Sequence, residues 1–522
     1  MAAVYLIFRS AYYFPDPMRW ELAVAAEGFR AAWHKHHLLY TPLAAALHAA
    51  LRPLGYTGGW YGAMQILDAA VGAAGFALAY SIFRRAAVTP PLALAGSFAA
   101  AFSFGYWSYA CNAQYIILVT VGAMAAFWAV QRAAGGRGFG RWVAAAAAAG
   151  ATVFAHVVNV LLLPFVVIAY FVLSGRRRWY EAAALAAAFL LPGAAGYVVV
   201  AFAGLGLAGP GEAWRWFFGV PGVSKYYLSF RLVNPLLDLY AFGRNVFGLR
   251  WLKDVVAAGW TPAYGLLAAA TALGAAAVAV AFGGATRRFA RRGVGRRSAW
   301  LAAALFAPYA LFFTFREAGA LDRWTVQVFA AVFFIYASTA VAPSSGRWFR
   351  ALLYVLPVCF FAVNLWGSIC PESKPENNEH LAYARFVEGL TEPGDLVINA
   401  GGGGFGPDVY VRYFTGAETA ELGAAAEDDE AFRAYVDGKI AAGHGVFLTD
   451  ARPVVVAGEA FGFGASPAAG EATALAADVL KPYGQEYVAT YRGRRYRPST
   501  FWRLYPRAEL EARPRAEEGG HS

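Results

Sequence analysis

Long apolar runs separated by short polar segments fill the first two thirds of the chain. A helix needs about 20 apolar residues to cross the hydrocarbon of a bilayer. Eight runs meet that need: 60–83, 91–109, 113–131, 180–206, 261–283, 299–315, 323–342 and 348–367. The run 142–174 is too long for one span and contains His156, Asn159 and Pro164, which predicts two short helices that meet near His156.

The apolar residues 2–14 are few for a span, which leaves either a short first span or a helix that begins upstream of Met1. Counting this segment, the pattern predicts about 11 transmembrane helices. Segment 38–55 cannot also cross, so we expect an interfacial helix with Pro42 in its first turn.

Composition agrees with this pattern. The 522 residues are 59% hydrophobic and 15% charged, whereas soluble domains are about 25% charged. The three cysteines, Cys111, Cys359 and Cys370, show neither a disulfide framework nor a metal-ligand spacing. We therefore expect an α-helical polytopic membrane domain over residues 1–370.

Charge orients the predicted spans. Up to Cys370, Lys and Arg outnumber Asp and Glu by 29 to 10, and from Pro371 onward acids outnumber bases by 23 to 15. The basic clusters fall at alternate ends of the spans, which is the positive-inside pattern and not a nucleic-acid footprint. The pattern predicts a bacterial inner-membrane protein with N-in, C-out topology.

The part after residue 370 then lies outside the cytoplasm. Helical patterns over 380–390 and 430–442 alternate with strand patterns over 394–400 and 445–450, and 487–505 is typical of a hairpin. This predicts a small extracytoplasmic α/β domain over 371–507. We expect 508–522 to be disordered. The glycines at 401–404 follow a strand pattern, but no phosphate-binding motif accompanies them.

Nine of the ten carboxylates before residue 371 fall in predicted outer segments or near the outer face. Asp16 lies in the outer loop 14–59, between two prolines that restrict its backbone. A carboxylate there could act as general base toward an acceptor hydroxyl, with Glu21 as second choice. The alternative for Asp16 is an N-cap of a helix over 17–32.

Asp68 lies about two turns inside a predicted span. An ionisable group there costs roughly 2.5–3.5 kcal/mol on insertion scales and is a site hypothesis by default. Substrate binding and a polar contact between helices are the two alternatives.

Three other polar groups invite explanation. His34, His36 and His37 could anchor the interface, bind a phosphate or sugar hydroxyl, or, least favoured, hold a metal. Arg316, Glu317, Asp322 and Arg323 form an outer turn that could grip a lipid phosphate or cap two helices. The outer loop 207–260 mixes basic and aromatic residues, as expected of a membrane-surface segment or of a donor-phosphate clamp.

Two stretches carry a family resemblance. HHLLYTPL at His36–Leu43 is similar to the segment that begins the second helix of GT-C glycosyltransferases. YWSYACNAQY at Tyr106–Tyr115 resembles the W-x₅-AEVY segment of their bacterial branch, with Gln114 in place of Glu. That family includes protein O-mannosyltransferases and aminoarabinose transferases.

The resemblance implies transfer of a sugar from a polyprenyl-phosphate carrier, with Asp16 as the catalytic carboxylate. Family members include enzymes that need a divalent metal ion and others that do not. Together with Asp68, which its position inside a span marks, the candidate substrate-binding residues are His36, His37, Tyr40, Gln114, Arg316, Glu317 and Arg323. The acceptor stays open.

Two other function classes remain as alternatives. A transporter or flippase of lipid-linked sugars would place polar residues at the bilayer midplane and show internal repeats, and the sequence shows no repeat. A non-catalytic assembly subunit would explain Gln114. A channel is disfavoured because the sequence has no rings of charge.

Overall fold

The computed structural model describes residues 1–175, 178–218, 231–252, 255, 259–291, 296–316, 318–341, 346–399, 407–421, 429–449, 480–492 and 498–512. The chain divides into two compact units. One contains Met1–Ser10 and Ala23–Ser373, and the other joins Ala11–Leu22 to Lys374–Ser522. The short segment 11–22 thus packs with the C-terminal part of the chain, which the sequence pattern did not predict.

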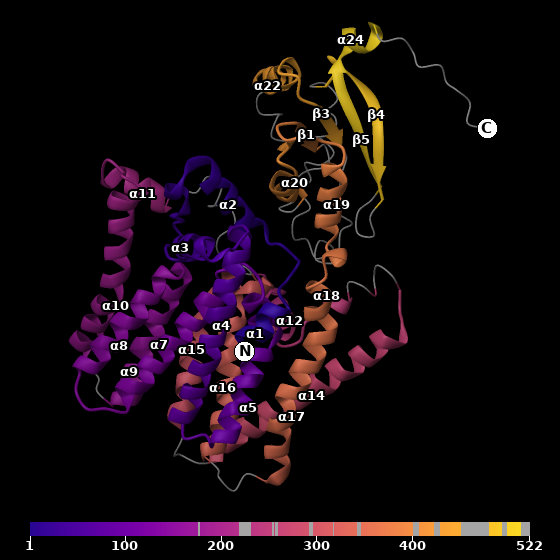
Figure 1. Cartoon of the computed structure of the whole chain (residues 1–522). Helices are drawn as coiled ribbons and strands as arrows, with labels where there is room; N and C mark the ends of the chain where they lie inside the picture. The colour runs from indigo at the N-terminus through magenta and orange to yellow at the C-terminus, as the bar shows by residue number, and fades with distance from the viewer. Residues whose placement is uncertain are drawn as a thin grey trace. The chain divides into compact units, whose positions relative to one another are not determined.

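The first unit is a bundle of helices (Figure 1). Its helices are α1 (Ala2–Ile7), α3 (Tyr40–Leu51), α4 (Trp60–Arg85), α5 (Pro90–Phe102), α6 (Phe104–Ala110), α7 (Ile116–Ala134), α8 (Gly140–Ala151), α9 (Leu162–Ser174), α10 (Trp179–Val199), α11 (Pro210–Phe218), α12 (Asn234–Val246), α14 (Pro262–Arg291), α15 (Arg296–Arg316), α16 (Thr325–Val341), α17 (Arg347–Asn364) and α18 (Cys370–Glu372). Helix α2 (Pro15–Glu27) begins in the second unit and ends in the first.

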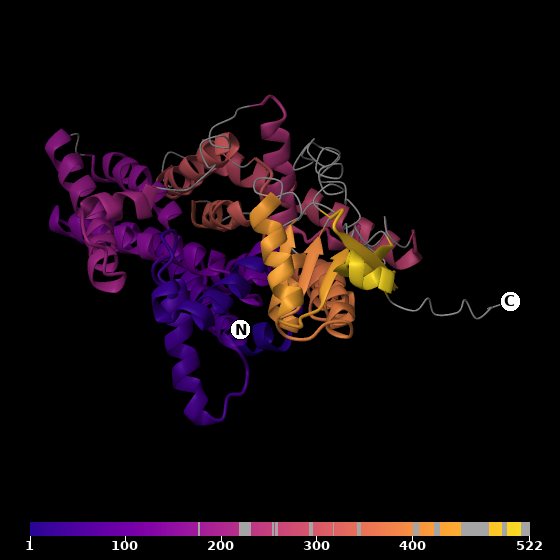
Figure 2. The same ribbon diagram turned by 90° about the horizontal axis from the view of Figure 1, so that it is seen from above.

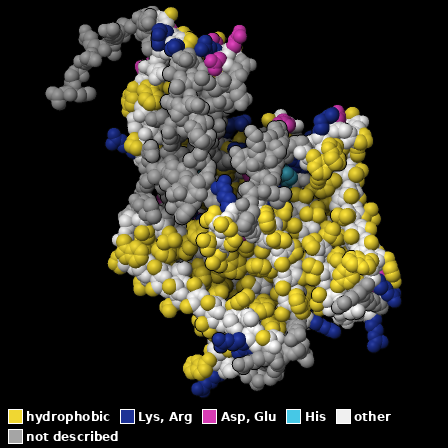
Figure 3. Space-filling model, turned by 180° about the vertical axis from the view of Figure 1, so that it is seen from behind, with side chains coloured by type: hydrophobic (Ala, Val, Ile, Leu, Met, Phe, Trp, Pro, Cys, Tyr) yellow, Lys and Arg dark blue, Asp and Glu magenta, His cyan; other side chains and the backbone are white. Residues whose placement is uncertain are grey.

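Among the described residues, seven helical segments are long and apolar enough to cross a membrane: Trp60–Arg85, Ile116–Ala134, Val157–Ser174, Trp179–Gly204, Pro262–Ala290, Arg297–Arg316 and Arg347–Glu372. Two shorter apolar helices, Pro90–Phe102 and Thr325–Ala340, accompany them. Hydrophobic side chains cover a broad face of this bundle, with Lys and Arg gathered at its lower end (Figure 3). The predicted helical membrane architecture is confirmed, while the count of eleven spans stays a prediction.

The run 91–109 is not the single helix that its hydropathy predicts. Ser103 adopts an extended conformation (φ −58°, ψ 141°) between α5 and α6. Its hydroxyl donates to the carbonyl of Ala100 at 2.7 Å and helps to end α5. All seven residues of α6 are buried, so this part of the run lies inside the protein and not against lipid.

The run 142–174 breaks where the sequence predicts. Helix α8 ends at Ala151, α9 begins at Leu162, and His156 between them is extended (φ −168°, ψ 141°). The Nδ1 atom of His156 accepts the backbone N–H of Val158 at 3.0 Å. The ring therefore caps the turn that leads into α9.

Only Ala2–Ile7 of the N-terminal apolar segment is helical. The next helix begins at Pro15, a favoured first helical residue. The predicted N-cap role of Asp16 is therefore wrong, because Asp16 lies inside the first turn. The helix also ends earlier than predicted, at Glu27, where Gly28 takes a positive φ (78°) that favours glycine.

The second unit is an α/β domain, as predicted. Its elements are α19 (Glu379–Glu388), β1 (Leu396–Asn399), α20 (Pro407–Thr415), β2 (Glu418–Glu421), α22 (Asp429–Ala441), β3 (Val446–Thr449), β4 (Tyr483–Tyr491), β5 (Ser499–Pro506) and α24 (Arg507–Ala512). The strand order is β2-β1-β3-β5-β4, in which β2, β1 and β3 are parallel and β5 is antiparallel to both of its neighbours, β3 and β4.

Alternate residues of β1 face two separate cores. Leu396 and Ile398 pack with Val436 of α22, whereas Val397 packs with residues of α19 and α20. The strands accordingly lie between these helices (Figure 2). Helix α24 covers 507–512, so the predicted disorder is wrong for residues 508–512. The glycines at 401–404 lie outside the described residues.

Candidate functional site

The carboxyl group of Asp68 is fully buried on α4. Its Oδ2 atom accepts the Tyr40 hydroxyl at 2.7 Å and the backbone N–H of Gln114 at 2.8 Å. These bonds tie the surface helix α3 and the α6–α7 loop to α4. The structure therefore shows the polar interhelical contact that the sequence left open, and its bond to residue 114 does not depend on the Gln114 side chain.

Four aromatic rings stack beside this contact. The ring centroids of His34 and His37 are 4.2 Å apart, those of His37 and Tyr115 4.9 Å, and those of Tyr115 and His156 4.6 Å. Each pair is within 20° of parallel. We call these four residues the ring stack. His36 lies at its edge, 6.2 Å from His156.

Backbone hydrogen bonds fix the ring stack in place. The N–H of Val157 donates to the carbonyl of His36 at 2.8 Å, and the N–H of Leu39 donates to the carbonyl of Phe154 at 3.0 Å. The loop before α3 is thereby joined to the break between α8 and α9. This explains why a histidine that the sequence marks only as a helix break, His156, takes part in the site.

Burial keeps the imidazoles uncharged near neutral pH. Burial, together with the charges of the neighbouring His36 and Lys35, lowers the pKa of His34 to about 4. Burial, followed by the charges of the neighbouring histidines, holds the pKa of His37 well below its usual range. A neutral imidazole offers one donor and one acceptor, so these rings can orient hydroxyl or phosphate oxygens without carrying charge.

Positive charge reaches the ring stack from the predicted arginine turn. The Nη1 atom of Arg323 lies 3.4 Å from the Tyr115 hydroxyl and 3.0 Å from the Asp322 carboxylate. Arg316 ends α15, with its guanidinium 5.5 Å from the centroid of Phe312. Arg323 thus has a carboxylate partner, as a local network in the turn predicts, and it also borders the ring stack. Phosphate binding by this turn stays a prediction. Glu317 lies outside the described residues.

The contacts are continuous from Asp68 through Tyr40 to the ring stack and Arg323, since Tyr40 lies edge-on to both His37 and Tyr115. The structure therefore brings together predicted residues from four separate segments of the chain. Tyr115 and His156 are the members that the sequence analysis missed as site residues, and His156 was marked only as a helix break. The place of Tyr115 at the end of the YWSYACNAQY stretch was the available signal.

A metal site has no support in this part of the chain. Within the ranges that the structure describes, no three His, Cys, Asp or Glu side chains are grouped so that they could hold a metal ion. The histidines of the ring stack face one another in parallel, and that arrangement does not direct their nitrogen atoms to a common point.

Asp16 and Glu21 belong to the other unit. The Asp16 side chain is 48% exposed and lies 3.9 Å from the guanidinium of Arg19. The Glu21 carboxylate accepts the hydroxyl of Tyr413 at 2.6 Å. Glu21 is therefore engaged in holding α2 to α20, whereas about half of the Asp16 side chain is exposed.

The segment that precedes Asp16 is held in the same way. The hydroxyl of Tyr410 donates to the carbonyl of Tyr13 at 2.5 Å, and the side-chain amide of Asn378 donates to the carbonyl of Ala11 at 2.9 Å. This stretch of the N-terminal loop is thus part of the packed structure of the second unit.

Arg250 of the loop 207–260 is buried rather than placed at the membrane surface. Its guanidinium lies 3.6 Å from the Glu372 carboxylate, which also accepts the Ser108 hydroxyl at 3.4 Å. A buried cation needs such a partner. This pair ties the loop before α14 to α6 and α18 within the first unit.

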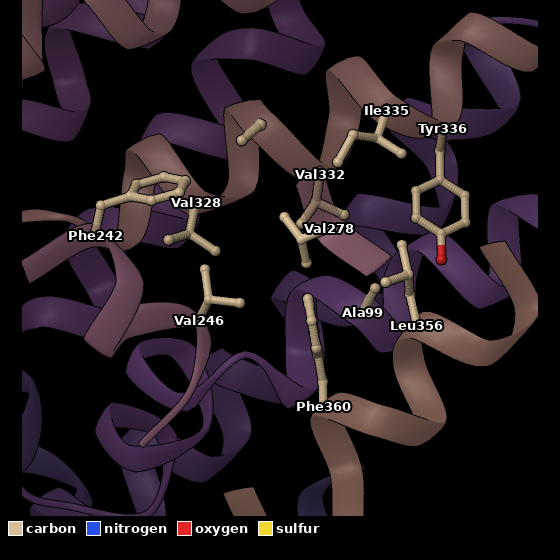
Figure 4. Close-up of a pocket in the computed structure, with 11 residues that line it drawn as sticks. Ala99, Phe242, Val246, Val278, Val328, Val332, Ile335, Tyr336, Leu356 and Phe360 are labelled. Atoms are coloured by element: carbon tan, nitrogen blue, oxygen red, sulfur yellow. The ribbon is translucent and has the colours of Figure 1, made fainter. Parts of the chain in front are cut away.

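A second internal feature of the bundle is an apolar cavity between α5, α12, α14, α16 and α17 (Figure 4). Its lining side chains are Ala99, Phe242, Val246, Val278, Val328, Ala331, Val332, Ile335, Tyr336, Leu356 and Phe360. The Tyr336 hydroxyl donates to the carbonyl of Leu353. The cavity therefore presents hydrocarbon and offers no polar chemistry.

These features define a multi-pass membrane protein with the GT-C fold, in which a helical bundle is followed by an α/β domain. The solved structures that it resembles include ArnT from Cupriavidus metallidurans in the apo state (TM-score 0.56) and bound to undecaprenyl phosphate (TM-score 0.54). In both comparisons 12% of residues are identical and 96% of each chain is covered.

A third similar structure is the archaeal oligosaccharyltransferase AglB from Archaeoglobus fulgidus, at 12% identity and a TM-score of 0.48, covering 95% of this chain and 73% of AglB. No family model and no curated protein matches the sequence. The predicted resemblance to GT-C enzymes is thus confirmed by the fold.

Proposed function

We propose that this protein is a glycosyltransferase that moves a sugar from a polyprenyl-phosphate carrier to an extracytoplasmic acceptor. The observation that carries the proposal is the likeness to ArnT, which covers 96% of both chains. One of the two ArnT structures holds undecaprenyl phosphate. The ring stack with Arg323 supplies a matching chemistry, because a guanidinium beside neutral imidazoles suits a phosphate ester.

In the proposed reaction an acceptor hydroxyl oxygen attacks the anomeric carbon of the sugar. The bond from that carbon to the phosphate oxygen breaks, and polyprenyl phosphate leaves with the electron pair. Asp16 takes the proton of the acceptor as general base. Asp16 is chosen over Glu21 because its side chain is 48% exposed, whereas the Glu21 carboxylate is bonded to Tyr413.

We assign the donor phosphate to Arg316 and Arg323, and the sugar or phosphate oxygens to His36, His37, Tyr40 and Gln114. Glu317 is assigned to the substrate as a whole and not to its phosphate, because a carboxylate repels that anion. Asp68 serves this group by positioning Tyr40 and the backbone of Gln114. The protein would lie in the bacterial inner membrane, with its C-terminal domain extracytoplasmic, where the acceptor is found.

The test is sugar transfer from radiolabelled polyprenyl-phosphate sugars in membranes that carry wild-type or variant protein. We expect Asp16→Asn to lose transfer by at least 10²-fold, the usual scale for a general base, while Glu21→Gln keeps most of it. Retained transfer in Asp16→Asn would remove Asp16 from the mechanism. Carrier translocation in liposomes without any transfer would instead show a flippase.

Arg323 allows a sharper test of the phosphate assignment. Lys keeps the charge of Arg but loses the planar fork that matches phosphate oxygens. We expect Arg323→Lys to raise KM for the lipid donor with a smaller effect on kcat, and Arg323→Ala to do so more strongly. Equal KM values in all three proteins would exclude the turn from donor binding.

A further inference from the structure

Helix α12 has its polar side chains on the inside. Asn234, Asp238, Ala241 and Asn245 form one stripe along the helix and are at most 6% exposed. A helix at the surface of a protein in water normally turns such residues outward.

The opposite face of the same helix is apolar and uncovered. Leu232, just before the helix, is 90% exposed, Leu236 and Leu239 are each 67% exposed, and Tyr240 is 51% exposed. In water these four side chains would form a costly apolar patch. Helix α12 is therefore amphipathic, but its polar face is buried and its apolar face is exposed. This arrangement suits an apolar environment and not water.

The features around this face indicate lipid as that surrounding. Thirteen residues span about 20 Å, too short to cross the hydrocarbon but suited to lie along one leaflet. Phe242 and Val246 of α12 line the apolar cavity together with α14 and α16, so the exposed face adjoins helices that cross the membrane. Arg231, which is exposed, precedes the helix, and a cation at that place suits the headgroup layer above the acyl chains.

The buried polar face is fastened to the candidate site. The side-chain amide of Asn234 donates to the carbonyl of Thr314 at 2.7 Å, and the N–H of Gly319 donates to Asp238 at 3.2 Å. Near the other end, α6 approaches so closely that a Cβ atom at Gly105 would lie 2.0 Å from Oδ1 of Asn245. Helix α12 thus bonds to residues on both sides of Arg316 and packs on α6.

We propose that α12 is a lipid-contacting helix, whose apolar face lies among the acyl chains of one leaflet and whose polar face positions the arginine turn at that leaflet's surface. An amphiphilic donor would then meet the turn directly from the bilayer. The lipid contact stands by itself, while the link to the donor rests on the proposed function.

The lipid contact is tested with spin labels in liposomes of phosphatidylethanolamine and phosphatidylglycerol. The three native cysteines are replaced by alanine, and single cysteines at Leu236 or Leu239 carry a nitroxide. We expect relaxation by oxygen to exceed relaxation by a water-soluble nickel complex several-fold. A label at Tyr487, a side chain 62% exposed on the α/β domain, should show the reverse order.

Nickel accessibility at Leu236 and Leu239 equal to that at Tyr487 would place this face in water and overturn the proposal. Low accessibility to both reagents would show that protein covers the face, and would overturn it as well. Neither result depends on whether the protein transfers a sugar.

The positioning role is tested separately through Asp238. Asp238→Asn keeps an oxygen that can accept the N–H of Gly319, whereas Asp238→Ala does not. We expect Asp238→Ala to raise KM for the lipid donor with little change in kcat, and Asp238→Asn to restore it. Equal impairment in both variants, or a loss in kcat alone, would contradict the positioning role. Absence of transfer in the wild-type protein would count against the proposed function only.

Discussion

At the scale of single residues, Asp68 shows how a buried carboxyl group, which costs free energy to place in a membrane, can hold two other segments of the chain in place. A carboxyl group inside a span marks a functional site by default, and the sequence supports that reading. In the structure its Oδ2 atom takes two donors from two different segments. The group therefore acts first on the arrangement of the site, and any contact with substrate goes through the residues it holds.

The Tyr40 hydroxyl offers a direct measure of this contact. We expect Tyr40→Phe to lower the free energy of unfolding in detergent by about 1–3 kcal/mol, because a buried acceptor loses its donor. Tyr56→Phe is the matched control, since the Tyr56 hydroxyl donates to the Gly59 carbonyl at an exposed position. Thermal unfolding monitored by circular dichroism compares them, and equal effects would contradict the structural role of Asp68.

The histidines predict a dependence of stability on pH. The pKa of His34 is about 4 in the folded protein against 6.5 for a free histidine, so the unfolded chain binds more protons between these values. The contribution of neutral His34 to the free energy of unfolding is therefore complete above pH 6.5 and falls as the pH drops toward 4. The loss is up to about 3 kcal/mol, lessened by the part of the ring that meets solvent.

Unfolding midpoints of wild-type protein and His34→Gln between pH 4 and pH 8 test this. We expect the variant to show the shallower decline, because glutamine binds no proton. His37 contributes in the same direction, so some decline should remain. Parallel curves would show that His34 titrates alike in both states.

At the scale of elements, close helix packing depends on residues too small to be noticed in a hydropathy pattern. Gly150 of α8 lies against the backbone of α10, where an added Cβ atom would lie 1.9 Å from the carbonyl oxygen of Phe189. Small residues allow such approaches between helices in membranes. The close contact also fixes the α8 end of the break that carries His156.

We expect Gly150→Ala to destabilise the bundle by about 1–3 kcal/mol, the usual cost of overpacking. Gly193→Ala on the facing helix is the matched control, because its Cβ atom would lie 3.7 Å from Val153, an ordinary contact. Thermal stability in detergent separates the two variants. A Gly150→Ala protein as stable as Gly193→Ala would mean that α8 and α10 are further apart than described.

At the scale of the whole molecule, the C-terminal domain includes part of the N-terminal loop. Residues 11–22 bond to α19 and α20 through Asn378, Tyr410 and Tyr413. The proposed catalytic Asp16 is consequently presented by this domain. Deleting the domain should therefore disturb Asp16 as well as any acceptor contacts that the domain makes.

The proposed topology predicts which loops are accessible from outside the cell. In cysteine-free protein, Tyr487→Cys should react with a membrane-impermeant maleimide on intact spheroplasts. Gly140→Cys, at the start of α8 between Arg137 and Arg141, should react only after lysis. Labelling of Gly140→Cys without lysis would reverse the orientation and with it the proposed location of the site.

The sequence by itself determined the class of architecture. Apolar runs of membrane length, basic loops at their alternate ends, and helix and strand patterns after residue 370 are local properties, since each depends on a few neighbouring residues. Even the break near His156 followed from Asn159 and Pro164 interrupting a long run. The same local signals pointed to Asp16, the histidines and the arginine turn.

Only the tertiary structure decided how those residues combine. Hydropathy cannot distinguish a buried helix from a lipid-facing one, so the run 91–109 predicts one span although α6 is buried in the protein. For the same reason, the pattern does not predict which face of α12 is buried. The bonds of Asp68 to Tyr40 and Gln114, and the place of His156 beside Tyr115, join segments far apart in the chain. Such contacts arise when the whole bundle packs, because burial and partners depend on neighbours that the local sequence does not contain.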